Sequence, residues 1–369
     1  MILEKLSIRD FRNYEACDLE LSEGVTMLSG RNAQGKTNML EAIYALSAGR
    51  SFRASKDSEM VRWGAEAAWV KGWISGSYSD FTLSFSVNAG GRKSARLNDV
   101  GRIKPSELSE RMNAVAFIPD DLNLVKGSPS ERRRFLDMQI SQISPLYRDT
   151  LTTYLRTLQQ KNALLKDYHE TVDAGRLLDV FNESLLDSGS RLMSMRHDAV
   201  TRLAPHAAST YSYIAESDEE LQITYIPSVD FNAGETIEGL RDAFRRKMNA
   251  LRAAEIARGG SLTGPQRDDI GLSVAGRHAS TFGSQGQQRT VVIALKLAEA
   301  EVISDFREET PIVLLDDVLS ELDEGRRSRL ISRFLGKCQT VITATDAEYA
   351  GSMPGCKAYR VCGGEVRQL

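Results

Sequence analysis

Cysteine is scarce in this sequence, and its spacing gives no sign of a metal site or a disulfide framework. The chain has 369 residues and four cysteines, Cys17, Cys338, Cys356 and Cys362. No two of them have the paired spacing of metal ligands, and so few cysteines in so long a chain do not build a disulfide scaffold. We therefore expect reduced thiols, as in a cytoplasmic protein.

Long apolar runs are also missing. The first residues, MILEKLSIRDF, contain acids and bases but neither the apolar stretch nor the cleavage pattern of a signal peptide. No run approaches the ~18 apolar residues of a transmembrane helix. We therefore expect no membrane partner.

An excess of positive charge is absent as well. The 47 lysines and arginines face 50 acidic residues, for a formal net charge of -3, so no global positive field favours nucleic acid. Nucleic-acid binding would need local basic patches, each of which has an alternative interpretation as a solvated or acid-paired face. The candidate clusters are Arg50 with Arg53 and Lys56, Arg92-Lys93 with Arg96, Arg132 to Arg134, and Arg245-Arg246-Lys247.

The pattern of apolar residues predicts an α/β fold in two parts. Strand-like spacing occurs in segments 2–9, 15–21, 25–29, 67–75, 81–88, 92–97 and 115–118. Helical spacing then dominates in segments 151–165, 176–214 and 236–256, with one strand candidate at 221–226. Beyond Gly259-Gly260 the α/β pattern returns, with helices at 291–303 and 324–335 and strands at 312–315 and 339–344. We therefore predict one α/β lobe from residues 1–124 and 259–369, and an inserted, mostly helical lobe from residues 125–258.

The clearest motif follows the strand candidate at 25–29. It reads Gly30-Arg31-Asn32-Ala33-Gln34-Gly35-Lys36-Thr37 and fits the phosphate-loop pattern G-x-x-x-x-G-K-[ST]. Glycines let backbone N–H groups turn inward around a phosphate, and the helix that follows offers its N-terminus to negative charge. Lys36 would reach the β- and γ-phosphates of ATP, and the Thr37 hydroxyl would bind Mg²⁺. The alternative is a glycine-rich turn that caps a helix.

Two carboxylates end an apolar strand late in the chain. The sequence Pro311-Ile312-Val313-Leu314-Leu315 runs into Asp316 and Asp317. Charges at the end of a buried strand are costly unless they are paired or bind a metal. We interpret Asp316 as the residue that holds Mg²⁺ through water, and Asp317 as the residue that positions water or acts as a base. The alternative is an aspartate N-cap for the next segment.

A third element precedes the predicted helix at 291–303. It reads Phe282-Gly283-Ser284-Gln285-Gly286-Gln287-Gln288-Arg289. A serine and a glycine at the beginning of a helix favour an anion site, whereas an ordinary serine N-cap is the alternative. We take Ser284, Gly286 and Gln287 as candidate nucleotide contacts because of their place just before the Asp316-Asp317 strand.

The order of these elements resembles that of ABC-type ATPases: phosphate loop, helical insertion, S-x-G-Q, apolar strand with two acids, then Ser320-Glu321-Leu322-Asp323. Four further blocks are similar to the RecF family: 6–14 (LSIRDFRNY), 117–122 (FIPDDL), 127–137 (GSPSERRRFLD) and 263–269 (TGPQRDD). The resemblance runs the length of the chain. It implies a P-loop ABC-type ATPase head, a mixed sheet around a phosphate loop, related to SMC heads but without their long coiled coils.

The resemblance also implies how such a protein works. Two subunits close head to tail over two ATP molecules, so that Ser284 and Gly286 contact the γ-phosphate held by the partner subunit's Lys36. The ATP-dependent homodimer clamps gapped or junction DNA with little sequence preference and hydrolyses ATP slowly. RecR and RecO are the implied partners, and loading of a recombinase is the implied outcome. Arg12, after the first strand, is the candidate contact to the base or ribose.

Three features depart from the pattern of ABC ATPases. Asp317 stands where glutamate is common, and its shorter reach suggests slow turnover. Segment 343–346 (TATD) lacks the switch histidine of transporters, and no glutamine near residues 116–121 marks a Q-loop.

Two other functions use the same phosphate loop. An ABC transporter ATPase subunit would need a membrane partner and would not bind DNA. A small-molecule kinase would leave the Ser284 element and the helical lobe without a purpose.

Overall fold

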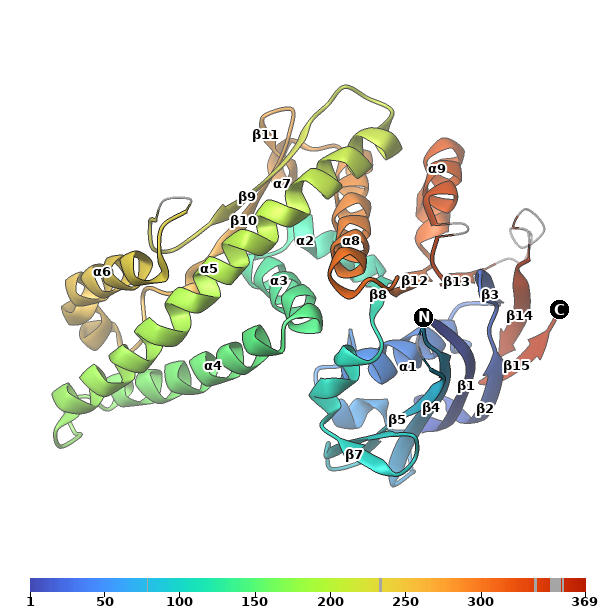
Figure 1. Cartoon of the computed structure of the whole chain (residues 1–369), viewed down its shortest axis with the longest axis horizontal. Coiled ribbons are helices and arrows are strands. Elements are labelled where there is room, and N and C mark those ends of the chain that lie inside the picture. The colour runs from blue at the N-terminus through green and yellow to red at the C-terminus, as the bar shows by residue number, and fades with distance from the viewer. Residues whose placement is uncertain (78, 232–233, 335–336, 346–352, 354) are drawn as a thin grey trace. The chain divides into compact units, whose positions relative to one another are not determined.

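The computed structural model describes residues 1–77, 79–231, 234–334, 337–345, 353 and 355–369 (Figure 1). The chain divides into two compact units. The first contains Met1–Asp121, Tyr213–Glu216 and Ile293–Leu369, and the second contains Leu122–Ser212 and Ser217–Val292.

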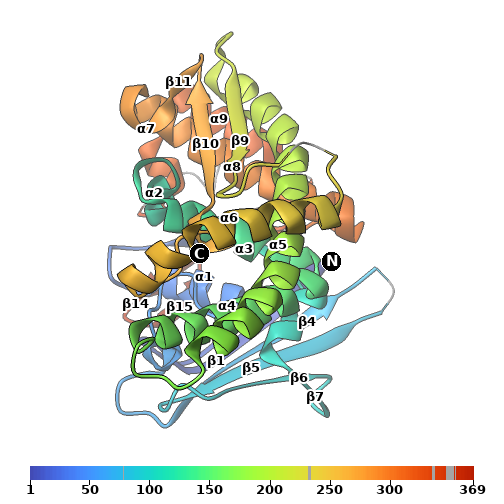
Figure 2. The ribbon, with the colours of Figure 1, turned by 90° about the vertical axis from the view of Figure 1, so that its left-hand side faces the viewer.

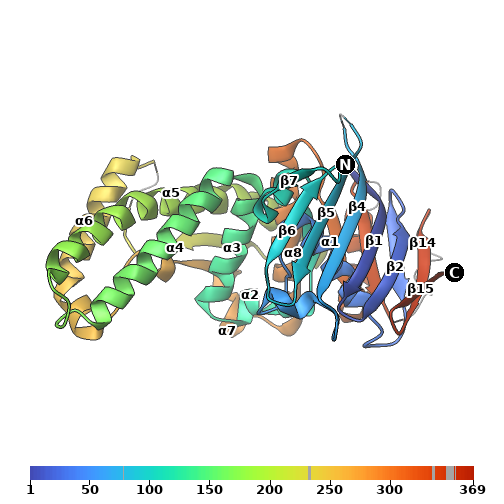
Figure 3. The same ribbon diagram turned by 90° about the horizontal axis from the view of Figure 1, so that it is seen from below.

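An antiparallel sheet of six strands forms one layer of the first unit. Its order is β2-β1-β4-β5-β6-β7, and Figure 3 shows these strands side by side. The strands are β1 (Ile2–Phe11), β2 (Tyr14–Glu20), β4 (Ala67–Ser75), β5 (Phe81–Asn88), β6 (Lys93–Leu97) and β7 (Gly101–Ile103). Along β1 and β4 buried apolar residues alternate with more exposed ones, so one face of the sheet is buried and the other faces solvent.

A second sheet of the same unit carries the candidate site. Its order is β15-β14-β3-β13-β12-β8, and all neighbouring pairs are parallel except β14 with β15. The strands are β3 (Val25–Ser29), β8 (Ala114–Phe117), β12 (Ile312–Asp316), β13 (Thr340–Ala344), β14 (Lys357–Cys362) and β15 (Glu365–Gln368). Every residue of β3, β12 and β13 is buried, as expected for central parallel strands. Because parallel strands end at the same edge, the loops after β3, β12 and β13 meet there.

Helix α1 (Lys36–Ala48) contacts strands of both sheets, including β4 of the first and β12 of the second. Ten of its 13 residues are buried, which explains its weak amphipathic pattern. The unit also contains α9 (Glu324–Phe334) and the 3₁₀ segments η1 (Asp57–Met60), η2 (Pro105–Glu110) and η5 (Val318–Glu321), with η3 (Pro119–Leu122) at its border. Two helices are shared between the units: α8 (Gln285–Arg307), because the second unit ends at Val292, and α5 (Ala174–Ala215), whose last residues from Tyr213 on belong to the first unit.

The second unit is mainly helical but has its own small sheet. Its helices are α2 (Asn123–Lys126), α3 (Pro129–Ile143), α4 (Pro145–Lys166), α5 (Ala174–Ala215), α6 (Ile237–Arg258) and α7 (Ala279–Phe282), with η4 at Pro265–Arg267. Proline at the first position of α3 and α4 suits a helix start, where its missing N–H is not needed. The strands β9 (Leu221–Ile226), β10 (Asp269–Val274) and β11 (Arg277–His278) follow the order β11-β10-β9 (Figure 2).

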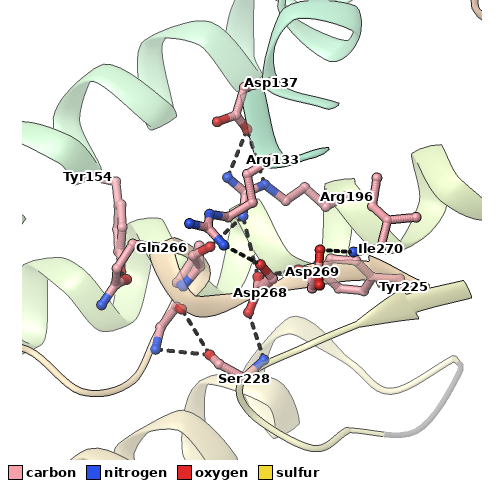
Figure 4. Close-up of polar contacts among 12 residues, drawn as sticks. Arg133, Asp137, Tyr154, Arg196, Tyr225, Ser228, Gln266, Asp268, Asp269 and Ile270 are labelled. Atoms are coloured by element: carbon pink, nitrogen blue, oxygen red, sulfur yellow. Dashed lines mark hydrogen bonds and ion pairs between the residues drawn. The ribbon is translucent and has the colours of Figure 1, made fainter. Parts of the chain in front are cut away.

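A buried network of hydrogen bonds and ion pairs connects the segment before β10 to helices α3 and α5 (Figure 4). Arg196 of α5 donates to Asp137 of α3 at 2.8 Å and to the carbonyl oxygen of Pro265 at 2.6 Å. The buried Asp268 accepts from the backbone N–H of Ser228 at 2.7 Å and from the Tyr225 hydroxyl. The arginine thus holds three chain segments together in the interior.

The observed units differ from the boundaries that the sequence predicts. The apolar pattern places the end of the inserted lobe at residue 258, yet residues 259–292 lie in the second unit. The reason is that β10 pairs with β9 along six residue pairs and that Asp268 belongs to the buried network. The strands β10, β14 and β15 are further elements that the apolar pattern does not predict.

Candidate nucleotide-binding site

The phosphate loop connects β3 to α1 through residues in unusual backbone conformations. Gly30, Ala33 and Gly35 have positive φ angles of 151°, 64° and 118°. A Cβ at Gly30 would lie 2.4 Å from the carbonyl oxygen of Val361, so a side chain at this position has no room. The two glycines of the motif therefore let the chain turn at the edge of the sheet.

The start of α1 is open to an anion. Its N-cap is Gly35, no side chain caps the helix, and no acid lies in the first turn. The Lys36 ammonium donates to the carbonyl oxygens of Gly30 at 2.6 Å and Arg31 at 3.0 Å, and so lies across the loop. Burial lowers the pKa of Lys36, and the nearby Asp317 and Asp316 oppose this effect. An uncapped helix start and a buried ammonium both favour the binding of negatively charged phosphate groups.

Thr37 and Asp316 meet at the base of the loop although 279 positions separate them. The Thr37 hydroxyl lies 2.9 Å from each oxygen of the Asp316 carboxylate, and the Thr343 hydroxyl donates to the same carboxylate at 2.8 Å. Burial raises the pKa of Asp316, whereas the hydrogen bonds from Thr343 and Thr37 oppose that rise. The sequence alone assigned no role to Thr343. Its position near the end of β13, the strand beside β12, could have indicated that it lies next to Asp316.

Asp317 has a left-handed backbone and a carboxylate oxygen that is still available. Its φ is 53°, and its N–H donates to the Thr343 hydroxyl at 2.9 Å. Its Oδ1 atom is buried and makes no hydrogen bond within the described part of the chain. The structure therefore presents a carboxylate directly beside Asp316 with an acceptor ready for a ligand.

Two turns hold the phosphate loop from outside. The Asn13 amide donates to the Gln34 carbonyl oxygen at 2.9 Å, from the turn between β1 and β2. From the turn between β14 and β15, the N–H groups of Gly363 and Gly364 donate to the Gln34 side chain at 2.8 Å and to its carbonyl oxygen at 3.2 Å. Gln34 thus anchors the loop, while Arg31, Asn32 and Ala33 are exposed.

Arg12 lies beside this loop but its guanidinium is already engaged. It donates to both oxygens of Glu41 at 2.9 and 2.6 Å and to the carbonyl oxygen of Glu59 at 2.6 Å. The fully buried Glu41 also accepts from Arg53 and from the Ser51 hydroxyl. A contact between Arg12 and a base or ribose would have to be made alongside these bonds, and sequence reasoning assigned no role to Glu41.

The Ser284 element lies in the second unit, at the start of α8. The Ser284 hydroxyl accepts from the Gln287 N–H at 3.2 Å, and the Gln287 side chain accepts from the Ser284 N–H at 2.8 Å. This reciprocal pair is a capping box. Ser284 is exposed, and Gln287 also donates to Glu219 at 2.9 Å. The N-cap interpretation therefore applies, and Ser284 and Gly286 do not lie in the same unit as the phosphate loop.

Acidic groups occupy several of the basic clusters proposed for DNA. Arg53 binds Glu41, Lys93 binds Asp57 at 2.8 Å, Arg132 binds Asp269 at 2.7 Å, and Arg245 binds Asp242 at 2.7 Å. Arg133 donates to the carbonyl oxygen of Asp268 at 2.7 Å. These cations already have partners within the chain, and contact between the clusters and DNA stays a prediction.

The residues present fit a nucleotide with Mg²⁺. Within the described ranges, no three histidine, cysteine or acidic side chains gather into a group that could hold a metal ion. A hydroxyl and one carboxylate suit Mg²⁺, which usually combines one or two carboxylates with phosphate oxygens and water. Asp346, part of the segment where a switch residue was sought, falls outside the described residues. Among the helices described, none has the length and apolar character needed to cross a membrane.

Comparison with known proteins identifies the family. A family model described as RecF/RecN/SMC N terminal domain matches residues 2–362. The chain is 40% identical over 349 residues to the DNA replication and repair protein RecF of Bacillus cereus (strain G9842), covering 94% of this chain and 93% of the relative. The chain belongs to the RecF family. RecF of Bacillus mycoides (strain KBAB4) has the same identity and coverage.

Solved structures confirm the fold class. Two structures of the recombination mediator protein RecF in the RecFOR pathway, designated RecF-ATPrS and RecF-ATP, match with a TM-score of 0.92 at 32% identity. Both matches cover 100% of this chain, and 98% and 97% of the RecF chains. An SMC head bound to the C-winged helix domain of ScpA matches with a TM-score of 0.58 at 16% identity, covering 100% of this chain and 97% of that chain. The SMC likeness concerns the fold alone.

Proposed function

We propose that this RecF-family chain is an ATP-gated DNA-binding protein of recombinational repair and replication-fork maintenance. The observation that carries the proposal is the meeting of Thr37 and Asp316 beneath a phosphate loop whose helix start is uncapped. A solved RecF structure with ATP supports the choice of nucleotide.

The phosphate loop from Gly30 to Thr37 binds the phosphates of ATP. Backbone N–H groups at the start of α1 receive the negative charge, and Lys36 exchanges the carbonyl oxygens of Gly30 and Arg31 for phosphate oxygens. When bound, Mg²⁺ would be held by the Thr37 hydroxyl and, through water, by Asp316, and it would neutralise charge on the phosphates.

Asp317 orients the water that attacks the γ-phosphate. Its available buried oxygen can accept a hydrogen bond from such a water, and the Thr343 hydroxyl fixes its backbone. Hydrolysis is slow and acts as a switch, because aspartate reaches less far than glutamate does.

Two copies close head to tail around ATP. Ser284, Gly286 and Gln287 at the start of α8 then contact the nucleotide held by the partner subunit's Lys36. The exposure of Ser284 is consistent with a contact in trans. The closed homodimer grips gapped or junction DNA through phosphate contacts, and RecR and RecO are its partners by family resemblance.

The transporter and kinase interpretations gain no support from the relatives described above. Both would retain the phosphate loop, but neither accounts for a match over 94% of the chain to a DNA replication and repair protein.

The proposal is tested by fluorescence anisotropy of a labelled gapped duplex at one fixed salt concentration. We expect tight binding with ATP and weak binding without it, and no effect of ATP on the Lys36→Ala variant. Equal binding with and without ATP would refute gating, and normal ATP affinity in Lys36→Ala would refute the assignment of the phosphate loop.

A further inference from the structure

The solvent face of the antiparallel sheet in the first unit gathers tryptophan and basic side chains. On β4, Trp69, Lys71 and Trp73 alternate with the buried Val70 and Gly72, so all three lie on the outer face. In Figure 3 this sheet faces the viewer, with its strands β4 and β1 at the centre. Large apolar side chains on a solvent face need an explanation, because single-sided sheets normally present polar residues there.

Strand pairing brings cations from neighbouring strands next to these tryptophans. Lys5 pairs with Trp73 and Arg9 with Trp69 across β1 and β4. On the other side Ser84 lies between Lys71 and Arg96, and Arg96 pairs with the exposed Arg102 of β7. The face therefore carries five cations: Lys5, Arg9, Lys71, Arg96 and Arg102. They come from four strands, so no run in the sequence contains them.

Trp69 is the more accessible of the two tryptophans, and a base that stacks on Trp73 would displace the ammonium groups that lie over its ring. Trp69 is 50% exposed, and Trp73 is partly exposed, with the ammonium groups of Lys5 and Lys71 5.3 and 4.9 Å from its ring centre. The strand β5 beside them presents the small residues Thr82, Ser84 and Ser86 opposite Trp73, Lys71 and Trp69. Thr82 and Ser84 are small and partly exposed, whereas Ser86 opposite Trp69 is buried.

Acidic groups also lie on this face, and they are weakly held. Glu20 lies opposite Lys5 across β1 and β2, and its side chain is 75% exposed. Asp18 pairs with Arg9 at 2.9 Å, with side-chain exposures of 49% and 45%. Asp99 pairs with Lys71 at 2.5 Å and is likewise exposed. Such surface ion pairs contribute little to stability, so phosphate groups can compete for these cations.

We propose that this face binds single-stranded DNA, with Trp69 and Trp73 stacking on unpaired bases and the surrounding cations holding the phosphates. A single-stranded ligand is indicated because aromatic platforms flanked by cations bind bases that are free to leave the helical stack. Trp69 and Trp73 stand four residues apart on one strand, about 14 Å. Bases stacked along one strand are about 3.4 Å apart, so two bases that meet both rings belong to an extended strand.

The identity of the ligand as DNA rests on the proposed function, but the binding does not require ATP. The surface lies in the first unit, and its residues are not those of the phosphate loop. A protein that clamps gapped DNA would gain a separate site for the unpaired strand of the gap.

The test is fluorescence anisotropy of a labelled oligo(dT) of about 15 nucleotides with the full chain and without nucleotide. Trp69→Ala and Trp73→Ala should each weaken binding about tenfold, since stacking of one base contributes that order of affinity. Trp63→Ala is the matched control: Trp63 is 97% exposed and lies outside the strands. It should bind as the unchanged chain does. Trp69→Phe and Trp73→Phe should retain most of the affinity because they keep a ring.

A second arm tests the cations. Lys71→Glu and Arg96→Glu should weaken binding and reduce the slope of log affinity against log salt by about 0.7 for each phosphate that the protein no longer neutralises. Arg176→Glu, an exposed charge reversal in the second unit, should leave both unchanged.

Three results would overturn the proposal: unchanged oligo(dT) binding in both tryptophan-to-alanine variants, an equal loss in Trp63→Ala, or tighter binding of a blunt duplex than of oligo(dT). The ATP effect on gapped duplex, measured with the same variants, separates the two proposals. If the tryptophan variants lose oligo(dT) but keep the ATP effect, both proposals stand. If oligo(dT) binding behaves as expected while ATP has no effect, only the gating proposal fails.

Discussion

Asp317 combines a left-handed backbone with a buried oxygen that no group in the described part of the chain satisfies. Both features cost free energy and persist where surrounding structure enforces them, commonly at sites of chemistry. We predict that Asp317→Asn slows ATP hydrolysis on the order of 100-fold, while ATP still binds. A neutral amide accepts a hydrogen bond from water more weakly than a carboxylate does and cannot take its proton. Single-turnover hydrolysis measures the rate, with Glu324→Gln as a nearby exposed control. Unchanged turnover would mean that another residue positions the water.

Glu41 links the phosphate-loop helix to two arginines. Burial alone would raise its pKa, but hydrogen bonds from Arg12, Arg53 and Ser51 outweigh burial and lower it. A carboxylate whose pKa is lower in the folded state stabilises the fold above its ordinary pKa of 4.5. This stabilisation is lost as the pH falls through the folded-state pKa.

We therefore predict that Glu41→Gln lowers the free energy of unfolding by about 3 kcal/mol at pH 7. The difference from the unchanged chain should shrink as the pH falls below 4.5. Urea unfolding at pH 7 and at lower pH measures this, with the exposed Glu15→Gln as the control. A difference that stays constant with pH would show that the lost hydrogen bonds, not the charge, matter.

The site residues that could be predicted from the sequence are those that belong to a short local motif. Lys36 and Thr37 belong to one loop, and Asp316 ends an apolar strand, so each could be placed without knowing the fold. The partners of Arg12, Arg53 and Arg132 could not, because a basic residue carries no sign of the distant acid that pairs with it. Their acids, Glu41 and Asp269, became apparent only from the folded chain.

At the scale of elements, the phosphate loop depends on turns that contain none of its own residues. Gly364 donates to the carbonyl oxygen of Gln34, and a Cβ on Gly364 would lie 2.6 Å from the carbonyl oxygen of Asn13. A Cβ on the adjacent Gly363 would meet no described atom within 4 Å, although both glycines have positive φ. A substitution at either position strains the backbone, but only a substitution at Gly364 also makes a steric contact with Asn13. Comparing the two therefore distinguishes the effect of the contact from the effect of the strain.

We predict that Gly364→Ala weakens ATP binding severalfold more than Gly363→Ala does. Both changes strain the backbone by roughly 1 kcal/mol, but only the former pushes the turn away from Asn13 and the loop. Titration with a fluorescent ATP analogue measures the affinity, and thermal unfolding measures the strain that they share. Equal affinities would show that this turn does not position the loop.

The long helices and the central buried strands could be predicted, because they form by burying the same apolar residues that make their pattern visible in the sequence. The helices α4, α5 and α6 and the strands β3 and β12 lie where the periodicity placed them. The strands β10, β14 and β15 were missed although β10 and β14 are longer than β3 and β12, because they lack the continuous apolar run that marks those central strands. β10 exists beside β9, and β14 beside β3, and neither pairing follows from local sequence.

For the whole molecule, the proposed function requires two copies, because Ser284 of one copy is proposed to contact the nucleotide held by the partner subunit's Lys36. We predict that Ser284→Arg leaves ATP binding of the monomer intact but prevents ATP-driven dimerisation, because the larger cation fills the space for the nucleotide. Analytical ultracentrifugation with and without ATP measures the dimer, with the exposed Ser280→Arg as the control. A normal dimer in Ser284→Arg would contradict the contact in trans.

All three tryptophans of the chain lie between residues 63 and 73. The intrinsic fluorescence of the protein therefore reports on the antiparallel sheet of the first unit and its approach segment, and the second unit is optically silent at tryptophan wavelengths. Far-ultraviolet circular dichroism, by contrast, is dominated by helices such as α4, α5 and α6. If fluorescence and circular dichroism change at the same temperature or denaturant concentration, the two units unfold together. If they change at different points, the units unfold one after the other.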